Sequence, residues 1–217
     1  MKKIFFATII TLITLISNAQ VKERELSHYI FKDFTQGFIF MKDGMTSRGA
    51  LNYNSVTEEM LFKDKGKIKS IGKDEIELVD TVMINGRKFY PYKGKFLEIA
   101  YTKDGKELQV EHKCRVIEPP QPSAYGSTTE TSSTKTYTSL MANGIFYDLT
   151  IPEGYRIVPY KYYWFKSGGK MEKIINIRQL EKLFKGEKER YKEYMKENTV
   201  NFNNEIEVTE LVKQMIN

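Results

Sequence analysis

Short apolar segments alternate with tight-turn signals over residues 34–117, and this pattern predicts a series of antiparallel strands. The turn signals are Lys42-Asp43-Gly44, Lys65-Gly66-Lys67, Asn85-Gly86 and Lys103-Asp104-Gly105. Asp-Gly and Asn-Gly supply the positive φ that tight hairpins require, and connections this short favour antiparallel neighbours. Strands are expected over residues 37–41, 49–53, 59–63, 75–79, 81–84, 87–90, 95–102 and 107–117.

The segment 107–117 has the clearest strand pattern. Leu108, Val110, His112, Cys114 and Val116 alternate with charged or amide side chains. Successive side chains of a strand point to opposite faces, so this strand is expected to have one core face and one solvated face.

The pattern breaks over residues 118–138. Pro119, Pro120 and Pro122 precede a run rich in Ser and Thr, and such a run has too little apolar area to pack. A mobile loop or linker is expected here, with a partner-binding surface as the alternative. Strand patterns resume over 139–175 and complete the β-rich body, most clearly at 145–151, 156–165 and 171–175.

The last segment, residues 176–217, changes to a helical period. Asn176 and Gln179 have the spacing of a capping box, and apolar residues then recur three and four positions apart in three short stretches. These narrow stripes predict helices that pack on the body. The expected fold is α+β: an antiparallel β-rich body, a meander closing into a sandwich, roll or small barrel, with a three-helix C-terminal tail.

Residues 1–19 have the features of a secretory signal peptide. Lys2 and Lys3 precede an uncharged stretch over 4–16, and Ser17-Asn18-Ala19 places small residues before a cut at Gln20. The stretch is shorter than the roughly 20 apolar residues of a transmembrane helix, and no second stretch approaches that length. We expect export to the periplasm or the extracellular space, a β meander beginning at residue 20, and no transmembrane segment after signal removal.

Composition limits the chemistry. The 217 residues are 41% apolar and 29% charged, with a net charge of +6, one Cys and two His. One Cys excludes an intramolecular disulfide framework, and two His exclude a His-rich metal cluster. No cofactor or metal is expected. Blocks of basic residues are missing, so a nucleic-acid partner is not expected either.

His112 and Cys114 are the only pair resembling a nucleophile and its base. Residues two apart on a strand stand about 6.5–7 Å apart at about 3.3 Å per residue, which is too far for a direct hydrogen bond. Their apolar neighbours indicate core packing instead. No catalytic residue can therefore be nominated, and the protein is not expected to be an enzyme.

An aromatic run is the most suggestive feature for binding. Tyr160, Tyr162 and Trp164 fall on one strand face, and Tyr163 and Phe165 fall on the other. Exposed Tyr and Trp form rigid contact surfaces for sugars or proteins. Burial of both faces in a central strand is the alternative.

Several segments resemble a loose group of uncharacterised exported β-rich proteins of Bacteroidota. They are Ser17-Asn18-Ala19-Gln20, the stretch from Phe34-Thr35-Gln36-Gly37 to Lys42-Asp43-Gly44, Leu51-Asn52-Tyr53-Asn54, Val79-Asp80-Thr81-Val82 with Arg87-Lys88-Phe89, and the tail from Leu183-Phe184 to Tyr194-Met195-Lys196-Glu197-Asn198. The resemblance implies an envelope or secreted location, and it implies no activity.

The sequence thus favours a non-enzymatic interaction or structural protein of the cell envelope, whose partner is an envelope protein or a glycan. A carbohydrate-binding module using Tyr160, Tyr162 and Trp164 is the first alternative. A hydrolase without identifiable catalytic residues is the second.

Overall fold

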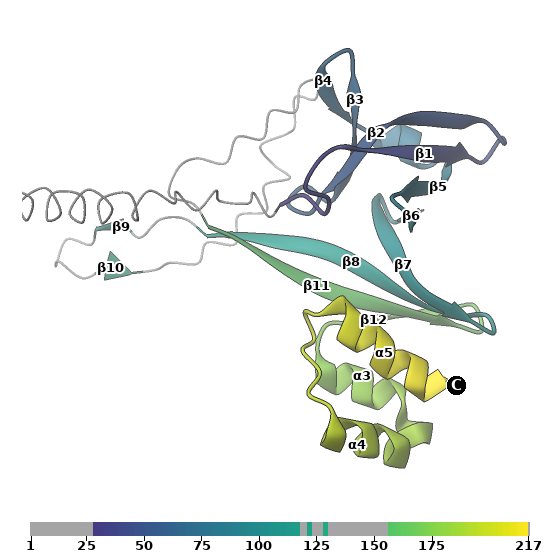
Figure 1. Cartoon of the computed structure of the whole chain (residues 1–217), viewed down its shortest axis with the longest axis vertical. Helices are drawn as coiled ribbons and strands as arrows, with labels where there is room; N and C mark the ends of the chain where they lie inside the picture. Colours follow the sequence, from purple (N-terminus) through teal and green to yellow (C-terminus); the bar gives the residue numbers. More distant parts are fainter. Residues whose placement is uncertain (1–27, 118–120, 123–127, 130–155, 217) are drawn as a thin grey trace, which may run out of the picture.

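The computed structural model describes residues 28–117, 121–122, 128–129 and 156–216. Within this part of the chain, ten strands form one antiparallel sheet in the order β12-β11-β8-β7-β6-β5-β1-β2-β3-β4 (Figure 1). The strands are β1 Thr35–Met41, β2 Thr46–Asn54, β3 Glu59–Asp64, β4 Lys67–Ser70, β5 Val79–Ile84, β6 Arg87–Tyr92, β7 Lys95–Lys103, β8 Lys106–Ile117, β11 Arg156–Ser167 and β12 Lys170–Ile174. A separate two-residue pair joins β9 Gln121–Pro122 to β10 Thr128–Thr129.

The predicted turn residues close hairpins in the structure. Asn85 and Gly86, between β5 and β6, have φ values of 49° and 76°. Positive φ at both central residues is the requirement of the type I′ turn, whose twist matches that of the flanking strands. The Asn-Gly signal therefore predicted this connection correctly, and it fixes the register that pairs Ile84 with Arg87.

The two β-rich stretches of the sequence belong to one sheet. Strand β11 pairs with β8 from Arg156 opposite Ile117 to Lys166 opposite Glu107. The chain between them is therefore an excursion between neighbouring strands. Apart from β9 and β10, the predicted linker over 118–138 lies outside the described residues, as does the strand expected over 145–151.

The expectation that the meander closes is wrong. Strands β4 and β12 are the two ends of the described sheet and do not pair with each other. The sheet does curl. The Cys114 amide of β8 donates to the Ser55 carbonyl between β2 and β3 at 3.0 Å, although β8 and β2 are not neighbours in the sheet. Helices pack on part of one face of the ten-stranded sheet and form a core with it.

The helices of the described residues are more divided than the predicted three-helix tail. They are α2 Lys73–Ile76, α3 Ile177–Leu183, the 3₁₀ turn η2 Lys185–Glu187, α4 Lys188–Glu197 and α5 Glu205–Ile216. The strand predicted over 75–79 is wrong: its first residues belong to α2, where the Glu75 carboxylate accepts from the Gly72 amide at 2.7 Å. None of the described helices is long and apolar enough to cross a membrane.

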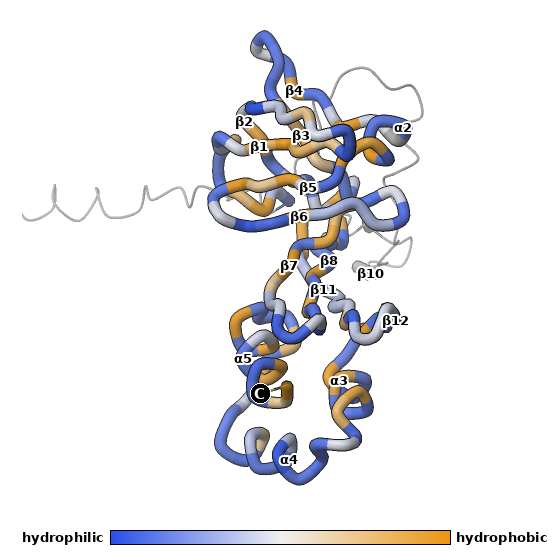
Figure 2. The backbone as a smooth tube through the Cα atoms, turned by 90° about the vertical axis from the view of Figure 1, so that its right-hand side faces the viewer, coloured by the Kyte–Doolittle hydropathy of each residue, from blue (hydrophilic) through white to orange (hydrophobic). Residues whose placement is uncertain are grey.

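Two apolar clusters lie along the same face of the sheet. The first cluster joins β8, β11 and β12 to α3, α4 and α5, and includes Tyr163, Leu180 and Leu211. The second lies under strands β1 to β7 and includes Tyr53 and Phe89. In Figure 2 the apolar colour of the tail falls mainly on α3 and α5. Alternation along the strands and helical stripes in the tail together account for this arrangement.

Leu211→Ala should lower the free energy of unfolding by about 2–5 kcal/mol, because a buried Leu loses its packing and leaves a cavity. Leu211 is completely buried against the sheet. Ile206→Ala in the same helix is the matched control, since Ile206 is 74% exposed and should change stability by about 0.5 kcal/mol or less. Urea denaturation of both variants tests the difference. Equal effects would show that α5 does not share the core.

Candidate functional site

The aromatic run occupies β11 and presents different residues to the two faces of the sheet. Tyr163 and Phe165 are buried in the cluster with the helices, whereas Tyr160, Tyr162 and Trp164 are half-buried on the opposite face. The described helices pack against the first face, through α5 on β7 and β8 and α3 on β12. We call the opposite side the open face: Val158 to Lys166 of β11, Glu107 to Arg115 of β8, and the side chains beside them.

Aromatic rings on the open face contact one another along β11 and across the sheet. Tyr160 and Tyr162 meet at 5.3 Å between ring centroids, and Trp164 meets Tyr92 of β6 at 5.1 Å. Strands β6 and β11 are three positions apart, which is about 14 Å in a flat sheet. Trp164 and Tyr92 therefore lean toward each other over β7 and β8, and no local pattern in the sequence indicates that Tyr92 joins the run.

The buried carboxylate of Glu111 holds the side chains of this surface in place. Glu111 of β8 is completely buried, and it accepts hydrogen bonds from Trp164 Nε1 at 2.8 Å and from Lys95 Nζ at 2.5 Å. Lys173 Nζ of β12 lies 2.9 Å from the same carboxylate. Burial alone raises the pKa of the Glu111 carboxyl, but the three hydrogen bonds outweigh it and lower the pKa to about 2. Glu111 thus stays ionised and fixes the indole.

Basic side chains surround and partly cover the rings. Lys173 Nζ lies 4.6 Å from the ring centroid of Tyr162 and 5.2 Å from that of Trp164. The Arg115 guanidinium lies 4.9 Å from the Tyr160 ring. Cations over aromatic faces are attracted by the ring quadrupole. The open face is therefore a mixed surface of rings and positive charges.

Lys95 and Lys113 complete the network through Glu58, which belongs to the turn between β2 and β3. Lys95 Nζ lies 3.0 Å from Glu58, and Lys113 donates to the same carboxylate. The solvated face predicted for the strand 107–117 is wrong at its centre, because Gln109 and Glu111 are completely buried and Glu111 belongs to an ion-pair network. The alternating charges were visible in the sequence, but their partners come from distant strands.

A second polar cluster lies on the helix-covered face. Cross-strand pairing places Phe89, Glu98, Val110 and Tyr163 in one row, so that Glu98 stands between the two apolar clusters. Arg87 donates two hydrogen bonds to Glu98, and His112 Nε2 lies 2.6 Å from Glu98 Oε2. Burial alone raises the pKa of the Glu98 carboxyl, but these partners outweigh it and hold the pKa below its usual value.

Glu98, His112 and Glu205 are the described residues with the type and spacing of metal ligands. One ligand atom from each lies within 4.8 Å of the others. However, Arg87 Nη2 donates to Glu98 and lies 3.5 Å from His112 Nε2 and 3.7 Å from Glu205. The guanidinium therefore already provides the positive charge at the centre of the cluster, and a metal ion would have to displace it.

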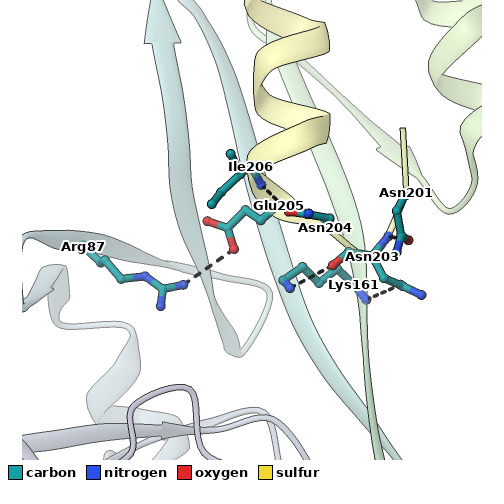
Figure 3. Close-up of a pocket in the computed structure, with 7 residues that line it drawn as sticks. All are labelled: Arg87, Lys161, Asn201, Asn203, Asn204, Glu205 and Ile206. Carbon is teal, nitrogen blue, oxygen red and sulfur yellow. Dashed lines mark hydrogen bonds and ion pairs between the residues drawn. The ribbon is translucent and has the colours of Figure 1, made fainter. Parts of the chain in front are cut away.

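A polar pocket of about 520 Å³ opens beside this cluster, at the start of α5 (Figure 3). Arg87 points toward Glu205 from one side, and Lys161 donates to the Asn203 carbonyl at 3.1 Å on the other. Asn201, Asn204 and Ile206 complete the lining. The Asn203 amide donates to Asn201 Oδ1, the Ile206 amide donates to Asn204 Oδ1, and Lys161 donates to the Asn203 carbonyl. These hydrogen bonds hold the loop before α5 in place.

His112 and Cys114 do not form a catalytic pair in the structure. His112 is buried and turns to Glu98. Cys114 is only half-buried, less than the apolar pattern predicted, and Ser55 is its hydrogen-bond partner. Burial nevertheless raises the pKa of the Cys114 thiol to about 12, which keeps it from forming the reactive thiolate.

Comparisons with known proteins provide no relative. Neither the models of protein families, nor the curated proteins, nor the solved structures include a match to this chain.

Acid should destabilise the protein through Glu111. Its pKa is about 2 in the folded chain, against a usual value of 4.5, so the unfolded chain takes up the proton first as pH falls. The stabilising contribution is complete above about pH 4.5 and is lost toward pH 2, with a slope of at most about 1.4 kcal/mol per pH unit. Unfolding free energies of the wild type and Glu111→Gln across this range test it, and the variant should have the shallower slope. Glu189→Gln, at a carboxylate that is 89% exposed, is the control; a Glu111→Gln slope equal to wild type would contradict the assignment.

The Cys114 thiol should react slowly with iodoacetamide at pH 7.5 in the native protein and rapidly in denaturant. The raised pKa leaves little thiolate in the folded state. Mass spectrometry of timed samples measures both rates. Similar rates in the two conditions would show that the folded environment does not protect the thiol.

Proposed function

We propose that the protein is a non-enzymatic binding protein of the cell envelope and that its open face binds carbohydrate. The observation that carries the proposal is the position of Tyr160, Tyr162 and Trp164: they share one half-exposed face of β11, while the described helices pack on the other. A ring that served only the core would be expected on the helix-covered side, as Tyr163 is.

The surface is ordered before any ligand binds, which supports recognition. The Trp164 indole is fixed by its hydrogen bond to Glu111 and by contact with Tyr92. A side chain already held in one orientation loses less conformational entropy on binding. Rigid aromatic side chains with a polar edge suit sugars, which present both apolar C–H faces and hydroxyl groups.

The envelope location is part of the same proposal. It rests on the secretory pattern of residues 1–19 and on the resemblance to exported Bacteroidota proteins. An exported protein with a glycan-binding face would meet polysaccharides at the cell surface or in the surrounding medium. A protein partner on the same face is the competing outcome of the binding experiment.

Trp164→Ala and Tyr160→Ala should each weaken binding to a recognised polysaccharide by about tenfold or more, because truncating a central aromatic anchor typically costs about 2 kcal/mol. Affinity electrophoresis with polysaccharide-containing gels would measure the effect, and thermal melts would establish that each variant folds.

Phe38→Ala is the matched control. Phe38 of β1 is exposed, and the Arg48 guanidinium lies 5.9 Å from the centroid of its ring. It lies outside the open face. Its loss should leave binding unchanged. Equal losses for Phe38→Ala and Trp164→Ala, or binding that survives both open-face variants, would refute the proposal. Shortening of the polysaccharide during incubation would favour a hydrolase instead.

A further inference from the structure

We infer that the open face selects anionic polysaccharides, those bearing carboxylate or sulfate groups, over neutral ones. This inference rests on the proposed function and adds the chemical class of the ligand. It comes from the charges that surround the rings, which the ring positions alone do not determine.

Positive charge exceeds negative charge on the described part of this face. Its basic side chains are Lys95, Lys113, Arg115, Lys166 and Lys173, and its acidic side chains are Glu58, Glu107 and Glu111. Lys95 and Lys113 are exposed to about the same extent as Glu58 and Glu107, so the accessible excess of charge comes from the other three cations. The side chain of Glu111 is fully buried, while those of Lys166 and Lys173 are 43% and 34% exposed. A ligand approaching the rings therefore meets mainly cations.

A ligand that contacts the rings of Tyr162 and Trp164 also meets the charge of Lys173. The Lys173 ammonium lies over both Tyr162 and Trp164, so a sugar that contacts these rings must also remove water from the ammonium. Glu111 accepts from one side of that group at 2.9 Å, and an ammonium has three donors. A neutral sugar compensates this desolvation only partly, whereas a carboxylate or sulfate supplies a charged acceptor.

The charges are spread along the strands. Arg115 lies opposite Val158, and Lys173 lies opposite Trp164. These two positions on β11 are six residues apart, which corresponds to about 20 Å at about 3.3 Å per residue. The Arg115 charge lies over Tyr160 and the Lys173 charge over the neighbouring Tyr162, so the two cations flank the pair of rings. The arrangement fits an extended chain that carries anionic groups along its length.

The experiment compares polysaccharides that differ only in charge. Polygalacturonate is paired with its methyl ester, and dextran sulfate is paired with dextran. At least one anionic member should bind about tenfold or more tightly than its neutral partner at 50 mM NaCl. Raising NaCl to 500 mM should remove most of this difference, because salt screens exposed charges over a few ångströms at that concentration.

Charge variants then locate the selectivity. Lys173→Gln and Arg115→Gln should each weaken binding of the anionic polymer by about 2- to 5-fold, the range expected for a partly exposed ion pair, and leave binding of the neutral partner unchanged. Lys192→Gln is the matched control, because it makes the same charge change on α4, where Lys192 faces Glu189.

The outcomes separate this inference from the proposed function. Equal binding of charged and neutral members, still lost in Trp164→Ala, would overturn charge selectivity and leave carbohydrate binding intact. If no polysaccharide of either pair bound in a way that Trp164→Ala weakens, both the charge selectivity and the proposed carbohydrate binding would be overturned. Polyglutamate binding as tightly as the anionic polysaccharides, with no effect of Tyr160→Ala, would identify a general polyanion surface and overturn the carbohydrate assignment.

Discussion

Pairing of β11 with β8 is the interaction on which the rest of the structure depends. It joins Arg156–Ser167 to Lys106–Ile117 along almost their whole length and brings the C-terminal part of the chain onto the sheet. Because side chains alternate across a strand, the same pairing builds two different surfaces. One receives α3, α4 and α5, and the other holds Trp164 against Glu111. A shift of one residue in this register would exchange the two surfaces.

The row of residues through Glu98 shows how this sheet combines two apolar clusters. Phe89 belongs to the cluster under β1 to β7, and Val110 belongs to the cluster under the helices. Glu98 lies between them and is satisfied by Arg87 and His112. Buried ion pairs contribute less to stability than apolar packing of the same volume. The cluster also meets the start of α5, because Arg87 forms an ion pair with Glu205 at 3.7 Å, while the Asn204 side chain accepts from the Ile206 amide there.

Local patterns predicted much of the fold and little of the site. The Asn-Gly turn and the alternation of the aromatic run depend on neighbours in sequence, and both were predicted from them. The segment 75–79 was misassigned because a short apolar run fits a strand or a helix equally well, and a hydrogen bond to Gly72 favours the helix. Tyr92 and Glu111 could not be connected to Trp164, because their contacts depend on strand order and on the curl of the sheet.

The two ends of the described sheet have a consequence for assembly. Strands β4 and β12 each have a neighbour on only one side, and an edge strand is a template for another chain. Both edges are rich in lysine: Lys67 and Lys69 in β4, and Lys170 and Lys173 in β12. A second copy that approached edge to edge would place these ammonium groups beside one another and desolvate them together. Lysines on an edge strand lose hydration when another strand pairs with it, so these side chains oppose the edge-to-edge addition of a second copy.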